Sequence, residues 1–536
     1  MNHLARRISI WLCVFLACLG FVLTGSVFIP YLGIEADEAL IANPIFGPVL
    51  HDFRLRIFHR DIPIMLMDYV GALKAWLYWP MFGTFKTSAE SLRLPVLIIG
   101  AITIWLFYLL LDRIAGTRAA LVGCFLLATD TMFLLTTEFD WGPVAIQHLM
   151  LVTACLLLFE FARKDRATYL LGGFFALGLG LWDKALFAWL IIGLCVAALV
   201  VFPKDLLRKL TVRNIGVALA GFVLGAGPLL VFNARHDWRT FRNNASFSAE
   251  NITQKTEILK RAINGSGLFG FMVNDSSSVT PEVPERWLER ASTSIADFAR
   301  DPHQNFLLPA LVLALAMAPL WGASRRAILF ALVFMAATWI QMALTKNAGG
   351  GVHHAVLLWP FPEFVVAAAL AEASGRWKRG GAMALGVVIA FLCVTNMLVT
   401  NQYLAGLIRY GPTVTWSDAI YPLSNSLAKE TREVIVMDWD IYDPLLLLRR
   451  SGANIRAGYF EIMNDAPGEA EKTIGSMLAS VPAVFITHTP ESQFFPVINQ
   501  KLENTAAALG YRKELLRALA DGHGRRVFEV YQFVKE

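Results

Sequence analysis

The chain alternates between long apolar runs and short segments that carry most of its charge. About eleven runs are long enough to cross the roughly 30 Å of a bilayer's hydrocarbon core as helices. They lie near residues 8–30, 92–111, 118–137, 143–162, 168–182, 185–202, 214–233, 306–321, 327–345, 353–372 and 381–400. The pattern predicts an α-helical polytopic membrane protein with about 11 transmembrane helices.

The charges between the runs predict the orientation. With the N-terminus in the cytoplasm, the segments on that side carry 16 Lys and Arg residues, whereas the short loops on the other side carry two, Lys184 and Lys346. This is the bias expected of cytoplasmic loops, and it is lost in the second half of the chain if 168–202 is one helix. We therefore interpret 168–202 as two helices. The first run is interpreted as a retained helix because it is long for a cleaved signal peptide.

Three longer segments fall on the outer side: 31–91, 234–305 and a tail from 402. The tail has the pattern of a soluble α/β domain, with apolar strands at 433–438, 483–487 and 527–533 and a helix at 495–509. We therefore predict a transmembrane catalytic domain over 1–401 and a periplasmic α/β domain over 402–536. No internal repeat is visible, so the sequence does not favour the repeat architecture of many transporters.

Composition agrees with this class. Hydrophobic residues make up 56% of the 536 and charged residues only 17%, which excludes a disordered chain, a collagen and a nucleic-acid-binding module. All six cysteines lie inside apolar runs without a CxxC pair, so neither a disulfide framework nor a zinc site is predicted.

Acidic residues cluster in two outer loops. Glu35, Asp37 and Glu38 follow the first run, and Glu138 and Asp140 fill the loop between the third and fourth runs. A carboxylate beside a low-dielectric region acquires the raised pKa that suits a general base. Two converging acidic loops could hold an acceptor hydroxyl or a divalent cation. The alternative interpretation is a solvated loop.

Cationic residues occupy the same predicted side. Lys184 separates two runs, and the glycine-rich loop 346–354 carries Lys346, His353 and His354. An ammonium at headgroup depth is suited to the phosphate of a lipid-linked substrate, although Lys184 could instead reach lipid headgroups. The apolar stretch 64–79 behind Pro63 predicts a helix lying at the membrane interface.

These positions resemble the GT-C class of polytopic glycosyltransferases, particularly the protein O-mannosyltransferase and aminoarabinose (lipid A) transferase group of glycosyltransferase family 39. The likeness covers about 31–233 and 346–372. It rests on Asp37-Glu38-Ala39, Ile62-Pro63-Ile64, Ser91-Leu-Arg-Leu-Pro95, Tyr108, Gly116, Asp140, Lys184 and Trp359-Pro-Phe-Pro362. The family usually has an arginine or lysine followed by tyrosine before the tenth helix, and here His353 and His354 take that place.

The predicted function is therefore an inverting glycosyltransferase of the bacterial inner membrane. It moves a hexosyl or pentosyl group from a polyprenyl-phosphate donor to a lipid, glycan or protein acceptor at the periplasmic face. We assign catalysis to Asp37, Glu38 and Asp140, and substrate binding to Glu138, Lys184, Lys346, His353, His354 and Arg93, the last from the Ser91–Pro95 motif. No redox cofactor is required, and a divalent cation stays open. The alternative is a lipid or polysaccharide transporter or flippase, which predicts charges inside helices.

Overall fold

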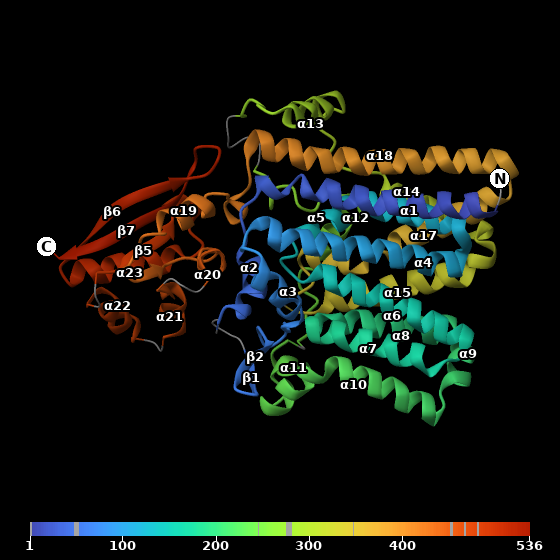
Figure 1. Ribbon diagram of the computed structural model, residues 1–536, viewed down its shortest axis with the longest axis horizontal. Helices are drawn as coiled ribbons and strands as arrows, with labels where there is room; N and C mark the ends of the chain where they lie inside the picture. The colour runs from blue at the N-terminus through green and yellow to red at the C-terminus, as the bar shows by residue number, and fades with distance from the viewer. Residues whose placement is uncertain are drawn as a thin grey trace.

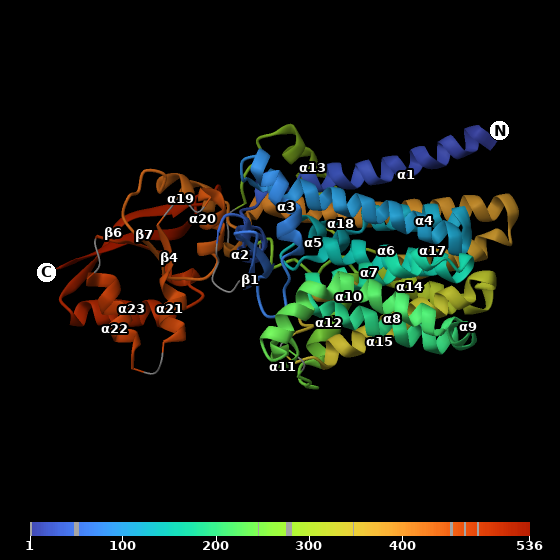
Figure 2. The ribbon, with the colours of Figure 1, turned by 60° about the horizontal axis from the view of Figure 1, so that its bottom comes forward.

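The computed structural model describes residues 3–47, 53–244, 246–274, 281–346, 348–450, 454–465, 468–479 and 482–535. A bundle of long helices and a smaller C-terminal sheet domain lie end to end along the longest axis of the molecule (Figure 1). Figure 2, turned by 60°, shows the same division. The predicted fold class, a helical membrane protein with a C-terminal α/β domain, is confirmed.

Each predicted apolar run falls in a helical part of the structure. The helices of the bundle are α1 His3–Ser26, α4 Ala89–Thr129, α5 Thr131–Glu138, α6 Val144–Lys164, α7 Ala167–Asp183, α8 Ala188–Val201, α9 Pro203–Lys209, α10 Val212–Arg235, α14 Leu307–Ala316, α15 Arg325–Leu344, α16 Val352–Ala355, α17 Phe361–Gly375 and α18 Lys378–Tyr410. The predicted boundary at residue 401 therefore falls inside α18.

The helix α4 contains the predicted run 92–111 and most of the run 118–137, the end of which forms α5. Its backbone leaves the helical region at Gly116, where φ is 81° and ψ is 167°, a left-handed value that glycine adopts without a steric penalty. Beyond this point Gly123 packs against Leu111 and Phe107 of the first half. The chain therefore folds back on itself at Gly116, as two separate runs require.

The predicted number of transmembrane helices is not confirmed. Within the described residues, seven helices are long and apolar enough to cross a membrane, or eight if α8 and α9, which meet at 108°, form one span. The difference arises because α4 holds one predicted run and most of another, α7 has 17 residues and α14 has 10. Ten helical residues span only about 15 Å.

The loops predicted to lie in the cytoplasm meet at one end of the bundle. Arg113 pairs with Glu160, and Lys209 pairs with Asp165 at 2.6 Å. Arg118 donates to Ser374 at 3.3 Å. In Figure 1 this end carries α9 and the N-terminus and lies far from the sheet domain. The common location agrees with the charge pattern, while the side of the membrane that it faces stays a prediction.

The outer segments lie toward the sheet domain. They form α2 Ala36–Ala42, the antiparallel hairpin of β1 Phe53–Ile57 and β2 Arg60–Met65, and the helices α3 Leu73–Thr84, α11 Arg239–Asn244, α12 Ile252–Ile263 and α13 Trp287–Phe298. The predicted interfacial helix over 64–79 is wrong in its first half, because residues 60–65 pair as a strand and the helix begins at Leu73. Pro63 is tolerated there because β2 is an edge strand of a two-stranded sheet.

The C-terminal sheet has the strand order β4-β3-β5-β7-β6, parallel over the first three strands and antiparallel over the last two. The strands are β3 Val434–Val436, β4 Ile455–Ala457, β5 Val484–His488, β6 Tyr511–Ala520 and β7 Arg526–Lys535. The helices are α19 Ile420–Ser426, α20 Tyr442–Arg449, α21 Gly458–Asn464, α22 Ala470–Ala479 and α23 Pro496–Ala508. The three predicted strands and the predicted helix are present. The sequence pattern missed β6, which is an exposed edge strand rich in charged residues.

Candidate active site

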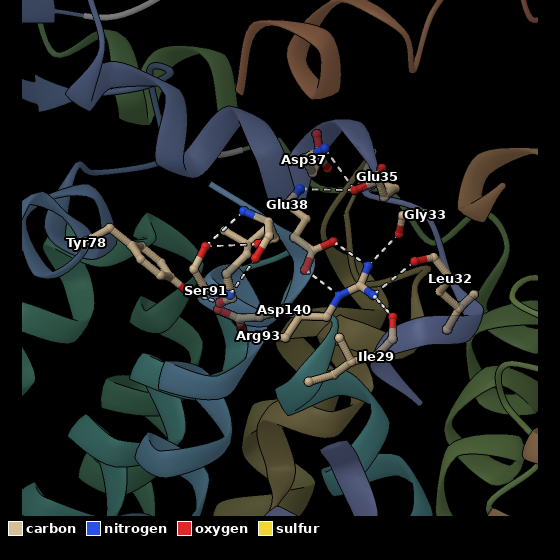
Figure 3. A network of polar contacts seen from close by, with 12 residues as sticks. Ile29, Leu32, Gly33, Glu35, Asp37, Glu38, Tyr78, Ser91, Arg93 and Asp140 are labelled. Carbon is tan, nitrogen blue, oxygen red and sulfur yellow. Dashed lines mark hydrogen bonds and ion pairs between the residues drawn. The ribbon is translucent and has the colours of Figure 1, made fainter. Parts of the chain in front are cut away.

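The acidic cluster after the first helix forms the beginning of α2. The side chain of Glu35 accepts hydrogen bonds from the backbone N–H groups of Asp37, at 2.8 Å, and Glu38, at 3.1 Å. Glu35 is therefore the N-cap of α2, a role that satisfies donors that the helix itself cannot. Figure 3 shows that Glu38 points toward Arg93, whereas Asp37 points away from it. Of these three neighbouring carboxylates, Glu35 caps α2, Glu38 faces Arg93, and Asp37 faces away from it.

Glu38 forms a fully buried ion pair with Arg93 of α4. Two guanidinium nitrogens of Arg93 lie 2.9 Å from the two carboxylate oxygens of Glu38. The remaining donors of Arg93 bind the backbone carbonyls of Ile29, Leu32 and Gly33 (Figure 3). All five guanidinium N–H groups are therefore used inside the protein.

This buried geometry does not fit the substrate-binding role predicted for Arg93. The sequence predicted that Arg93 binds substrate, but its side chain is completely buried and its donors are occupied. Arg93 instead fixes the chain around residues 29–33 and the helix α2 against the bundle. A buried pair of this kind is costly to break, about 3–5 kcal/mol, because the remaining charge loses its partner.

Asp140 lies in a second buried ion pair. Its carboxylate is 2.6 Å from the ammonium of Lys74 in α3, and it also accepts from the backbone N–H of Ala145 at 2.9 Å. Sequence reasoning missed Lys74, although a lone lysine inside the apolar stretch 73–82 is a signal of a buried partner. Asp140 thereby joins the first outer segment to the loop before α6.

Glu138 ends α5 behind the ion pair of Glu38 and Arg93. Its side chain is completely buried, and neither of its carboxylate oxygens has a hydrogen-bond partner among the described residues. It is near enough to Arg93 to interact electrostatically. In this position Glu138 has no access to an acceptor, so it takes part in the buried charge network.

A pocket opens on the other side of α2. Its lining combines groups that titrate with apolar groups: Asp37, Leu40, Ile41, Leu66, Met67, Tyr69, Val70, Trp141, Gly142, Pro143 and Lys184. Within the described chain, the side chains of Asp37 and Lys184 make neither a hydrogen bond nor an ion pair within 4 Å. The pocket therefore holds an unpaired carboxylate and an unpaired ammonium.

The backbone places Lys184 at this pocket. Val70 and Lys184 form an antiparallel β-bridge, supported by hydrogen bonds from Gly71 N to Asp183 O at 3.0 Å and from Ala185 N to Tyr69 O at 2.9 Å. A Cβ atom at Gly71 would lie 2.0 Å from the carbonyl oxygen of Trp182. Only glycine permits this close approach.

Burial sets the protonation behaviour of both pocket groups. Burial raises the pKa of Asp37 to about 6, while the nearby charge of Lys184 opposes the rise. Burial lowers the pKa of Lys184, and the charges of Asp37, Asp183 and Asp140 oppose that change. A carboxylate with a pKa near the working pH is suited to accept a proton.

The glycine-rich loop 346–354 reaches the pocket region through His353, whereas its Lys346 does not. The indole N–H of Trp141 donates to Nδ1 of His353 at 3.0 Å, so His353 carries its proton on Nε2. His354 packs edge-on against Trp189. The side chain of Lys346 is exposed, and no contact in the described chain joins it to the pocket.

Comparison with known proteins supports the resemblance. The family model described as dolichyl-phosphate-mannose-protein mannosyltransferase matches residues 71–230. The structure of apo ArnT from Cupriavidus metallidurans has a TM-score of 0.59 at 14% identity, over 98% of both chains. The chain has the fold of a GT-C glycosyltransferase. No curated protein matches the sequence.

Two further GT-C structures carry ligands. ArnT from Cupriavidus metallidurans bound to undecaprenyl phosphate has a TM-score of 0.58 at 13% identity, over 97% of both chains. The Archaeoglobus fulgidus oligosaccharyltransferase AglB, in complex with an inhibitory peptide and a dolichol-phosphate, has a TM-score of 0.50 at 13% identity and covers 99% of this chain and 74% of its own. The GT-C fold thus extends over both the bundle and the sheet domain.

The sequence left open a divalent cation bound between the acidic loops, and its presence stays a prediction. Among the residues that the structure describes, no three His, Cys, Asp or Glu side chains lie close enough together to hold a metal ion. In particular, Asp140 and Glu38 are already bound to Lys74 and Arg93.

Proposed function

We propose that this protein transfers one sugar from a polyprenyl-phosphate donor to an acceptor hydroxyl, with inversion at the anomeric carbon. The observation that carries the proposal is the pocket that holds the unpaired carboxylate of Asp37 together with the unpaired ammonium of Lys184. Such a transfer needs a base for the acceptor and a cation for the leaving phosphate. The GT-C fold and the lipid phosphates bound in ArnT and AglB support this donor class.

The proposed reaction is a single displacement. The acceptor oxygen attacks the anomeric carbon while the bond between that carbon and the phosphate oxygen breaks. Asp37 takes the hydroxyl proton, and the bonding electrons leave with the polyprenyl phosphate. Lys184 neutralises the developing charge of that phosphate, and the Nε2–H of His353 is a second donor in this role.

The supporting residues hold this geometry. Glu38 and Arg93 fix α2, and Lys74 and Asp140 fix the opposite wall of the pocket. We propose that the pocket lies at the periplasmic face of the inner membrane, because the short outer loops carry two cationic residues, Lys184 and Lys346, against 16 in the segments at the other end. The transporter alternative gains no support from the comparisons.

The direct test uses purified protein and radiolabelled polyprenyl-phosphate sugars. The protein is incubated with lipid, glycan and protein acceptors from the outer cell envelope, and radiolabel in the acceptor is measured. Asp37→Asn is the matched inactive control. The anomeric configuration of the product, determined by NMR, tests inversion, and chelation of divalent cations tests the metal. Absence of transfer from every polyprenyl-phosphate sugar contradicts the proposal.

A further inference from the structure

The helix α2 is too short to hold its own position. It has seven residues, and isolated helices below about 12–15 residues are marginal in water. Yet α2 carries Asp37, whose carboxylate has to meet the acceptor hydroxyl within hydrogen-bond distance. Its position must therefore come from its neighbours.

One neighbour is the C-terminal sheet domain. The first three N–H groups of α2 are all bound by carboxylates: Glu35 binds those of Asp37 and Glu38, and Oδ1 of Asp440 binds that of Ala36 at 2.6 Å. Asp440 lies 404 residues further along the chain. The distant domain thus completes the N-terminal cap of the helix.

A segment of the sheet domain that begins at Asp440, residues 440–447, also binds the other end of α2. The side-chain amide of Asn43, the C-cap residue, donates to Oδ1 of Asp443 at 2.9 Å and to its backbone carbonyl at 3.1 Å. Between the two ends, Leu40 packs against Leu446, and Ala39 and Ala42 share a buried cluster with Leu447. Contacts from residues 440–447 therefore run along the whole helix.

Asp440 itself has an unusual backbone. Its φ is 65°, in the left-handed region that residues other than glycine seldom adopt and that persists where the surroundings determine it. The Asp440 side chain is almost fully buried. On its opposite side, α2 is bound to Arg93 through Glu38, so the helix lies between the bundle and the sheet domain.

We propose that Asp440 and Asp443 are positioning residues for the transfer step, through which the sheet domain holds α2 and thereby aims Asp37. The proposal rests on the proposed function, because it takes Asp37 as the base. Neither aspartate is proposed to touch the reacting atoms.

The test compares Asp440→Ala, which removes the acceptor for Ala36 N–H, with Asp440→Asn, which keeps an oxygen there. Asp418→Ala is the matched control, because Asp418 also accepts from a backbone N–H, that of Gly522, but within the sheet domain. We expect Asp440→Ala to lower kcat about ten- to hundredfold, as a small displacement of a catalytic group does, with donor KM within twofold. Asp440→Asn should recover most of kcat, and Asp418→Ala should keep it.

Amide hydrogen exchange gives a readout independent of activity. Exchange over residues 36–42 should be faster in Asp440→Ala and in Asn43→Ala than in the parent and in Asp418→Ala. Asn43→Ala serves where Asp440→Ala does not fold. Parental kcat together with parental exchange in these variants overturns the proposal, as does an Asp440→Asn variant as slow as Asp440→Ala. If the parent transfers no sugar, the proposed function fails, while the exchange result still decides whether the sheet domain holds α2.

Discussion

The carboxylate of Asp37 and the ammonium of Lys184 line one pocket, and neither is tied to another side chain within the described residues. Nearby charges are bound instead, Glu38 by Arg93 and Asp140 by Lys74. The bound pairs are fully buried, whereas the unbound carboxylate and ammonium line the pocket, where Asp37 is half-buried and Lys184 is buried. This division separates the groups that hold the site from the groups that are free to react, and it leads to five predictions.

Asp37→Asn should lower sugar transfer by about 10²-fold or more, the loss typical of removing a general base. The variant should remain folded, because the Asp37 side chain is only half-buried and accepts no hydrogen bond in the described structure. Radiolabel transfer and thermal unfolding measure the two effects. Asp61→Asn, at an exposed carboxylate of β2, is the control, and near-parental turnover by Asp37→Asn would move the base to another residue.

Lys184→Gln should raise the donor KM about 10- to 100-fold. A hydrogen bond between charged groups contributes about 1.5–3 kcal/mol, which corresponds to this range of affinity. The measurement is transfer at varied donor concentration. Lys86→Gln, at an exposed lysine of the first outer segment, should leave KM unchanged. Unchanged donor binding in Lys184→Gln would mean that Lys184 contacts only lipid headgroups.

The pH profile of kcat/KM should fall on the acid side below about pH 6, because Asp37 acts only when ionised and its pKa is raised to about 6. Lys184 favours the ionised carboxylate, so Lys184→Gln should raise the pKa of Asp37 and move this limb to higher pH. Initial rates between pH 4.5 and 8, on the order of eight values, suffice. A limb that stays in place in Lys184→Gln would assign the titration to another group.

Arg93→Ala should destabilise the protein by about 3–5 kcal/mol, because it leaves the buried carboxylate of Glu38 without its partner. Arg93→Lys should also be destabilised, since a lysine has three donors where the arginine uses five. Thermal unfolding in detergent measures both. Arg56→Ala removes the exposed partner of Asp61 and should unfold near the parental temperature. Equal stability of Arg56→Ala and Arg93→Ala would contradict the role given to Arg93.

Gly71→Ala should lower both stability and transfer, because the new Cβ would lie 2.0 Å from the Trp182 carbonyl oxygen and would push the Tyr69 segment away from Lys184. Gly83→Ala is the control, since nothing lies within 4 Å of a Cβ there. Its position inside α3 should gain about 0.5–1 kcal/mol of stability. Parental transfer by Gly71→Ala would show that the bridge between these segments does not place Lys184.

The sequence by itself determined the class of the protein and pointed to two of the charged groups that line its pocket, Asp37 and Lys184. Apolar runs of sufficient length specify membrane helices because backbone polar groups in lipid must bind each other, and this local rule located the helical segments of the bundle. Shorter apolar runs located β3, β5 and β7, and the helical pattern located α23. The Asp37-Glu38 pair and Lys184 were found because charges at the ends of apolar runs are costly and therefore conspicuous.

The tertiary structure decided which of these charges are free. Asp37 and Glu38 are adjacent in sequence and chemically alike, and only the position of Arg93 on α4 makes one a buried anchor and leaves the other at the pocket. Lys74 and Asp140 are 66 residues apart, and Ala36 and Asp440 are 404 apart. Such pairings depend on how helices pack, a property of the whole chain, because ion pairs and caps form wherever folding brings donor and acceptor within about 3 Å.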